Sequence, residues 1–227
     1  MTSNEDNGGA PQVICSDRTL AVLICAATVL AVALMAHHPT AHAQDAAGLV
    51  AELARKAALN RFVHGALIGL LALLLFAFTE FSARPGFSSP LARAARLAFA
   101  TGAAASIVAA LINGFVVTGL AARYAEADAA ALDALRHLLR LCWQANQVFA
   151  ALGEVARGLA VLVWSCALLQ LGRSRLVGLT GLVLGGLPPA LVLTGLLRLD
   201  LHGAMLALLA TALWNLLLAV QLWRGRA

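Results

Sequence analysis

Charged side chains are scarce in this 227-residue sequence: only 12% of its residues are Asp, Glu, Lys or Arg, and 61% are apolar. A soluble domain carries about 25% charged residues, so there are too few charges here to cover a water-soluble fold. The single lysine is Lys56, and no basic cluster alternates with aromatic residues. We therefore expect no nucleic-acid partner and interpret the net charge of +5 as a sign of membrane topology.

Sequence motifs for common chemistries are also missing. The four cysteines, Cys15, Cys25, Cys142 and Cys166, form no CxxC pair, which excludes a disulfide framework of the usual spacing. The sequence contains no HExxH, GxSxG, GxGxxG or P-loop motif. These absences leave an enzymatic activity uncertain and favour a protein that is not an enzyme.

Long apolar runs are what the sequence does contain. Spanning a bilayer takes about 20 apolar residues of helix, and no segment alternates between apolar and polar residues as a barrel strand does. Six runs of about this length predict an all-α, polytopic transmembrane helix bundle whose surroundings are the lipid bilayer. The runs are 19–36, 62–79, 97–122, 148–171, 176–197 and 203–222.

The stretch "MAHHPTAHAQD", residues 35–45, allows the first run to be either cleaved off or retained. Ala41-His42-Ala43 resembles a signal-peptidase site, whereas a run of 18 residues after an acidic tail is typical of a retained signal anchor. Cleavage would leave five spans. The predicted segments are a disordered cytoplasmic tail (1–18), a first span or signal peptide (19–43), an extracytoplasmic amphipathic helix at the interface (44–61), and a five-span bundle (62–227).

The charges flanking the runs predict the orientation. Loops that carry Arg84, Arg93, Arg96, Arg173 and Arg175 are short and basic, and most acidic loop residues lie on the other side. The positive-inside rule therefore places both termini in the cytoplasm of a bacterial-type inner (plasma) membrane. All six histidines then lie at the outer face.

Polar residues within the runs are candidates for a site, because such residues are costly in a bilayer. Glu154 and Arg157 are three residues apart and can pair on one helix face. With Asn113, Asn146 and Gln147 they predict a pocket for a substrate or ion in the outer half of the membrane. The alternative is an ion pair that only fixes helix packing.

Two histidines suggest a different site. His64 and His202 each open a run in a similar setting, "HGALIGLLA" and "HGAMLALLA", and both runs cross in the same direction. A pair at equal depth is what a haem or a shared metal ion requires. The metal patch within 35–45 is less favoured, because Pro39 interrupts the spacing of His38 and His42.

Two further features concern packing. Gly178, Gly181, Gly185 and Pro188-Pro189 predict either a kinked packing helix or an interrupted helix at a transport site. Asn215 is expected to form an interhelical hydrogen bond.

Three functions remain open at this level. The first is binding or transport of a small solute or ion through an outward-facing polar pocket. The second is a membrane redox protein that holds haem or metal, the only cofactors suggested, through His64 and His202. The third is a structural or assembly subunit that associates with another membrane protein or with copies of itself.

Overall fold

The computed structural model describes residues 15–40, 43, 45–84 and 89–225, and within them every regular element is helical. The elements are α1 (Asp17–Ala36), α2 (Ala46–Arg55), α3 (Ala57–Ser82), α4 (Pro90–Leu111), the π-helical segment η1 (Ile112–Val117), α5 (Thr118–Arg123), α6 (Ala129–Gln170), α7 (Arg175–Leu193) and α8 (Leu201–Trp223).

Six helical units of the described chain are long and apolar enough to cross a membrane. They are α1, α3, α6, α7, α8 and the continuous unit α4–η1–α5. This confirms the prediction of an all-α bundle of six spans, and the protein is a multi-pass membrane protein.

Side-chain caps explain where several helices begin. Asp45 Oδ1 accepts a hydrogen bond from the Gly48 amide at 2.7 Å at the start of α2, and Asp128 Oδ1 accepts one from the Ala131 amide at 2.9 Å at the start of α6. Ser16 caps α1 in the same way. Such caps satisfy amides that the first turn leaves without partners.

The helix ends correct two predicted segments. The cap at Ser16 starts α1 at Asp17, so Asp17 and Arg18 belong to a helix and not to the tail, whose residues 1–14 lie outside the described part. The interfacial helix was predicted to reach residue 61 but ends at Arg55, and 57–61 form the first turn of α3. At the break, Lys56 Nζ lies 2.6 Å from Glu52 Oε1 and donates to the Thr40 carbonyl at 2.6 Å.

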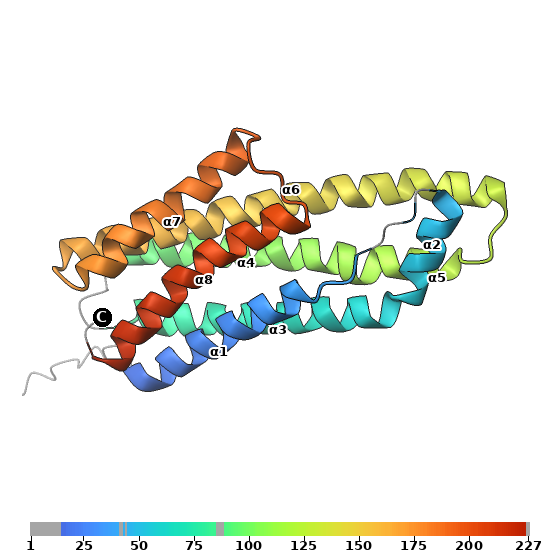
Figure 1. The fold of residues 1–227 in the computed structure, drawn as a ribbon. Coiled ribbons are helices and arrows are strands. Elements are labelled where there is room, and N and C mark those ends of the chain that lie inside the picture. The colour runs from blue at the N-terminus through green and yellow to red at the C-terminus, as the bar shows by residue number, and fades with distance from the viewer. Residues whose placement is uncertain (1–14, 41–42, 44, 85–88, 226–227) are drawn as a thin grey trace, which may run out of the picture.

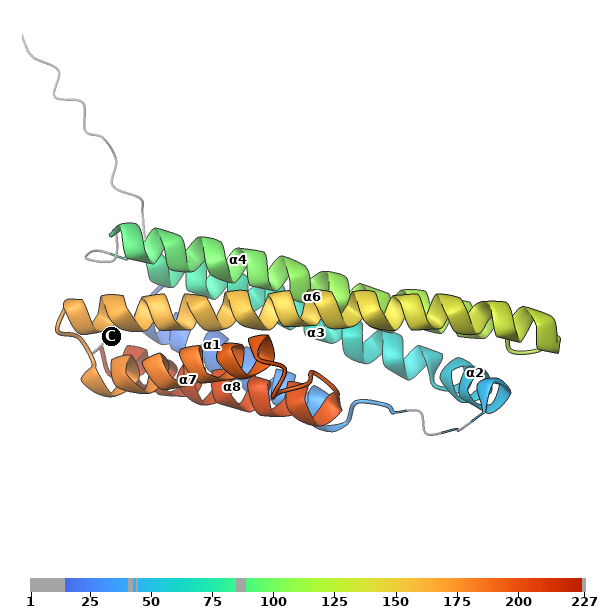
Figure 2. The same cartoon turned by 90° about the horizontal axis from the view of Figure 1, so that it is seen from above.

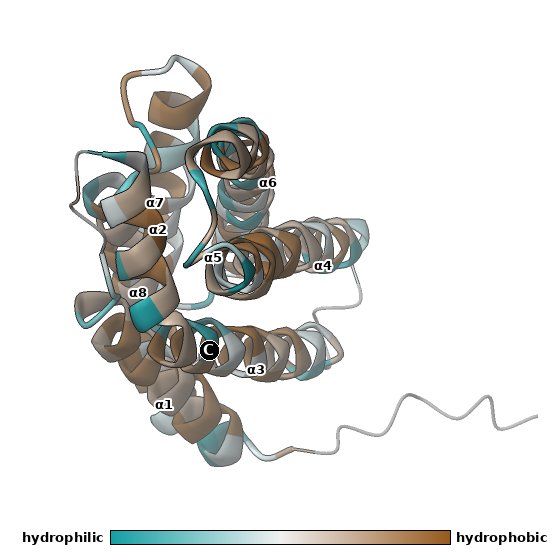
Figure 3. Cartoon of the chain, turned by 90° about the vertical axis from the view of Figure 1, so that its right-hand side faces the viewer, coloured by the Kyte–Doolittle hydropathy of each residue, from teal (hydrophilic) through white to brown (hydrophobic). Residues whose placement is uncertain are grey.

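The six spans form a closed ring in the order α1, α3, α4, α6, α7 and α8, because each packs mainly on two neighbours and α8 returns to α1. Figure 1 and Figure 2 show the ring from two sides, and Figure 3 shows it from the end where α2 lies. We call this end the α2 end. Asn215 Nδ2 donates to Thr28 Oγ1 at 3.1 Å and joins α8 to α1, which confirms the expected interhelical bond.

Aromatic side chains fill the ring at the end away from α2. This aromatic plug consists of Phe78, Phe81, Phe99, Trp164 and Trp214, all buried. The Trp164 and Trp214 rings stack with their centroids 6.1 Å apart, and Phe78 stacks on Trp164 at 4.8 Å. Both indole N–H groups have acceptors, as buried indoles require: Ser82 Oγ for Trp164 and the Val177 carbonyl for Trp214.

At the α2 end, part of the molecule extends beyond the length of a span. Helix α6 has 42 residues, which at 1.5 Å each make about 63 Å, against about 30 Å for a bilayer core. Its first half runs beside α5 and α2, past the ends of α1, α7 and α8 (Figure 2). Residues 129–147, which precede the fourth apolar run, are thus helical and continuous with the fourth span.

Helix α7 remains helical through Pro188 and Pro189. Its glycines bring it close to α6: a Cβ at Gly185 would lie 2.6 Å from the Leu162 amide nitrogen, and one at Gly158 would overlap Pro189. These close approaches are those of a glycine-lined packing helix. Neither proline lies on the cavity wall described next.

Candidate functional site

A cavity of about 610 Å³ lies inside the ring at the α2 end. Its wall is contributed by the end of α1, the middle of α3, η1 with the end of α4, the middle of α6, and the start of α8. Six of the predicted site residues line it together: His64, Asn113, Asn146, Gln147, Glu154 and Arg157. The seventh, His202, does not.

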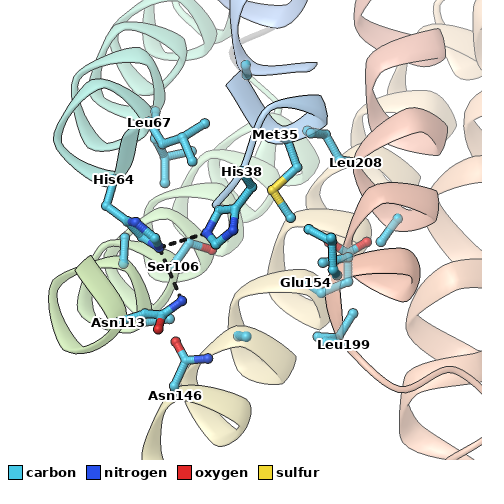
Figure 4. A pocket seen from close by; sticks show the side chains of 18 of the residues that line it. Met35, His38, His64, Leu67, Ser106, Asn113, Asn146, Glu154, Leu199 and Leu208 are labelled. Atoms are coloured by element: carbon cyan, nitrogen blue, oxygen red, sulfur yellow. Dashed lines mark hydrogen bonds between the residues drawn. The ribbon is translucent and has the colours of Figure 1, made fainter. Parts of the chain in front are cut away.

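Most of the wall is apolar. Met35, Leu67, Ile68, Ala110 and Leu208 are among the residues that surround the space, and Figure 4 shows Met35, Leu67 and Leu208 around it. The floor is formed by Leu74, which packs in the same core as the aromatic plug. The cavity is therefore an apolar chamber with a few polar groups, the usual composition of a small-molecule site.

Glu154 and Arg157 form one polar group of the wall. Arg157 Nη2 lies 2.9 Å from Glu154 Oε2, with the Glu154 side chain 4% exposed and that of Arg157 20%. Arg157 Nε also donates to the Gly153 carbonyl at 3.2 Å. The pair is held against α4, because a Cβ at Gly102 would lie 2.7 Å from Arg157 Cγ. The Glu154 carboxylate, which Figure 4 shows on the cavity wall, thus has its charge balanced by Arg157.

His64 is the centre of the second polar group. It is buried, and its Nδ1 lies 2.9 Å from the Asn60 carbonyl. A carbonyl only accepts, so Nδ1 carries the proton and Nε2 is left with a lone pair. The Asn113 amide Nδ2 donates to that Nε2 at 3.3 Å. Both Asn113 and Gly114 belong to η1, and π-helical turns inside α-helices are frequent at functional sites.

His38 completes this group from the segment after α1. Its Nε2 faces His64 Nε2 at 3.4 Å, and the two rings meet edge to face with centroids 4.9 Å apart (Figure 4). Since Nε2 of His64 accepts, Nε2 of His38 is the donor and its Nδ1 carries no proton. That Nδ1 is buried with no hydrogen-bond partner in the described part of the chain.

Burial, and after it the neighbouring His64, lower the pKa of His38 from 6.5 to about 4, against a smaller opposing effect of the Pro39 backbone. His38 is therefore neutral at neutral pH. With the Glu154–Arg157 pair balanced, these polar groups of the cavity wall bring no net charge.

Gln147 and Asn146 lie nearer the mouth. Gln147 Nε2 donates to the Leu199 carbonyl at 3.1 Å and so ties α6 to the segment between α7 and α8. Asn146, the preceding residue, also lines the cavity. Asp200, which caps α8 through the Gly203 amide, completes this rim.

His202 is exposed near the start of α8, whereas His64 is buried on α3. Helix α1 packs between these two helices. The structure therefore does not bring the two histidines together as one ligand pair, because similar positions in two parallel helices fix depth but not the direction of the side chains. Across the described ranges, no three His, Cys, Asp or Glu side chains form a group that could hold a metal.

Sequence reasoning missed His38, Asn60, Met35 and Ser106 as members of this wall. His38 is 26 residues from His64, and no periodicity connects a residue in an irregular segment to a helix. Asn60 and Ser106 stand on predicted helical segments, but single polar residues in such segments carry no signal of their direction.

Comparison of the chain with protein-family models, with curated proteins and with solved structures returned no match.

Proposed function

We propose that this protein binds a small amphiphilic molecule, with an apolar body and an uncharged or zwitterionic head, in the cavity at the α2 end. The observation that carries this proposal is the composition of the wall. Apolar side chains surround most of the space, while the His38–His64–Asn113 group and the Glu154–Arg157 pair supply hydrogen-bonding groups without net charge. An anionic head would meet no cation on the wall that is not already paired, because Arg157 is bound to Glu154, while the Asp200 carboxylate of the rim is held by the Gly203 amide.

The closed end of the ring favours binding over free conduction. Below Leu74 the interior is filled by the aromatic plug, whose rings are stacked and whose indoles are hydrogen-bonded. Transport across the membrane would require this plug to rearrange. The cavity instead supports uptake and release of the solute at one face.

We place the protein in a bacterial-type inner membrane, with the α2 end outside and the C-terminus in the cytoplasm. The support is the distribution of arginines, which favours the loops at the other end of the bundle. We further propose that the first span is retained as a signal anchor. Leu20 and Ile24 of α1 are fully buried in the bundle core, and Met35 and His38 belong to the cavity wall, so cleavage after Ala43 would remove part of both.

A cavity-filling variant tests the binding proposal. The purified protein is transferred to nanodiscs and its bound small molecules are measured by native mass spectrometry. Leu208→Trp places an indole in the cavity, whereas Leu209→Trp, its neighbour on the exposed face of α8, serves as the matched control. We expect at least a tenfold loss of the bound molecule in Leu208→Trp and none in Leu209→Trp. Equal occupancy in both variants, or a wild-type protein with only bulk lipid attached, contradicts the proposal.

A further inference from the structure

The two facing nitrogens of His38 and His64 are separated by 3.4 Å. Two imidazole nitrogens that bind one tetrahedral zinc-type ion, each at about 2.0–2.1 Å, lie roughly 3.3–3.4 Å apart. The separation therefore suits a shared metal ion as well as it suits a weak hydrogen bond. The rings approach edge to face, and the dashed line between them in Figure 4 joins the two Nε2 atoms.

We propose that Nε2 of His38 and Nε2 of His64 bind one divalent transition-metal ion of the zinc class on the wall of the cavity. This inference goes beyond the proposed solute site and does not depend on it, because both ligand atoms belong to the protein. The ion would replace the contact between the two Nε2 atoms, so the uncharged wall described above is that of the metal-free protein.

The outer side of the His64 ring is already arranged as in metal sites. Histidines that bind metal through one nitrogen commonly donate the other ring N–H to a backbone carbonyl or carboxylate, which fixes the tautomer. His64 does this through Nδ1 and the Asn60 carbonyl at 2.9 Å. The contact with Gly114 fixes the ring from the side. Nε2 is thus the unprotonated nitrogen, as a metal ligand must be.

The His38 ring is easier to account for with an ion present than without one. Without an ion, Nε2 must hold the proton that it donates to His64, and Nδ1 is a buried lone pair without a partner in the described residues. With an ion on Nε2, the same proton resides on Nδ1, and no proton is gained or lost. The Pro39 backbone also favours a protonated His38 ring.

Beyond the two histidines, the described residues offer few further ligands for the ion. The Asn113 amide lies 3.3 Å from Nε2 of His64, and turning it by 180° exchanges its nitrogen for the oxygen that a metal prefers. The described residues supply no third His, Cys, Asp or Glu. A position that the chain does not fill would be taken by water or an anion, as in metal sites that exchange ligands rather than in closed structural ones.

Metal binding can be tested with the ion alone. The full-length protein, freed of any histidine tag and of metal, is titrated with Co²⁺ and then with Zn²⁺ in competition. The visible absorption of Co²⁺ reports four-coordinate geometry. We expect one ion per chain, and at least a tenfold weaker affinity in His38→Gln and in His64→Gln. His37→Gln and His202→Gln remove exposed histidines at the same end of the bundle and should bind as the wild type does.

Several outcomes overturn the proposal: no saturable binding in the wild type, unchanged affinity in His38→Gln, or an equal loss in His37→Gln or His202→Gln. If His64→Gln does not fold because its ring packs in the core, His38→Gln decides alone, since His38 lies outside the helices. Because no organic ligand is present, a negative result here leaves the test with Leu208→Trp intact, and the reverse also holds.

Discussion

His64 stands against Gly114 with no room between them for a side chain: a methyl group at Gly114 would lie 2.6 Å from Cγ of His64. The contact joins α3 to η1 and fixes the His64 ring, to which Asn113 and His38 are hydrogen-bonded. A glycine in the widened π-helical turn is thus what allows the histidine to be buried on the cavity wall.

Gly114→Ala should therefore displace His64. We expect a loss of stability of about 1–3 kcal/mol, the usual cost of overpacking a core, together with weaker Co²⁺ binding. Gly69→Ala is the matched control, because no atom lies within 4 Å of a Cβ at that position of α3. The control should stabilise the helix by up to about 1 kcal/mol. Thermal unfolding in detergent measures the stability of both variants. Equal stabilities would show that a methyl group at Gly114 is tolerated beside His64.

The Glu154–Arg157 pair can be separated into a structural and a binding contribution. Glu154→Gln leaves the Arg157 charge without its partner, and removing one member of a buried pair costs about 3–5 kcal/mol. The double variant Glu154→Gln, Arg157→Met removes both charges and should recover most of that stability. A purely structural pair predicts that the double variant still binds the solute. We expect instead that it folds and has lost solute binding by native mass spectrometry.

The stability of the metal-free protein should decrease in acid through His38. Its pKa is about 4 in the folded protein, below the ordinary value of 6.5, because burial and His64 disfavour the charged ring. Between these values the unfolded chain binds a proton that the folded chain does not, so stability falls as pH falls from about 6.5 to about 4. In His38→Gln this part of the decrease should vanish.

The measurement is the midpoint of thermal unfolding against pH in the presence of a chelator. His37→Gln, which changes an exposed neighbour, should keep the wild-type slope. An identical slope in His38→Gln would show that His38 is not buried as neutral imidazole.

Retention of the first span has a direct signature in a tryptic digest. No Lys or Arg occurs between Arg18 and Arg55, so a retained span gives the single peptide 19–55. Cleavage after Ala43 gives 44–55 instead. We expect peptide 19–55 from membrane-extracted protein, since α1 supplies buried core residues such as Leu20 and Ile24. Recovery of 44–55 alone would contradict retention.

The spans were predictable because the thickness of a bilayer sets a length that apolar runs either reach or do not. The residues of the cavity wall were found for a related reason: Glu154, Arg157 and Asn113 are expensive in hydrocarbon, so they must face the interior. What the sequence did not reveal was direction. His202 repeats the local setting of His64 but is exposed, and η1 has no pattern that distinguishes it from the α-helix on either side.

The contact between His38 and His64 could not be predicted from the sequence for a different reason. It depends on how an irregular segment returns over the end of α1, and hydrophobic periodicity says nothing about such a path.

The ring closes between its earliest and its latest helix. Helix α1 packs on α3 and on α8, and Arg18 lies over the Trp223 ring, 5.6 Å from its centroid. During synthesis, α1 enters the membrane before α8 has been made. Until then the Thr28 hydroxyl of α1 lacks the hydrogen bond from Asn215. The cavity wall at Leu208 belongs to this same helix, the last of the ring to be made. A chain that stalls before α8 therefore has neither a closed bundle nor a complete binding chamber, so the site forms only after α8 has entered the membrane.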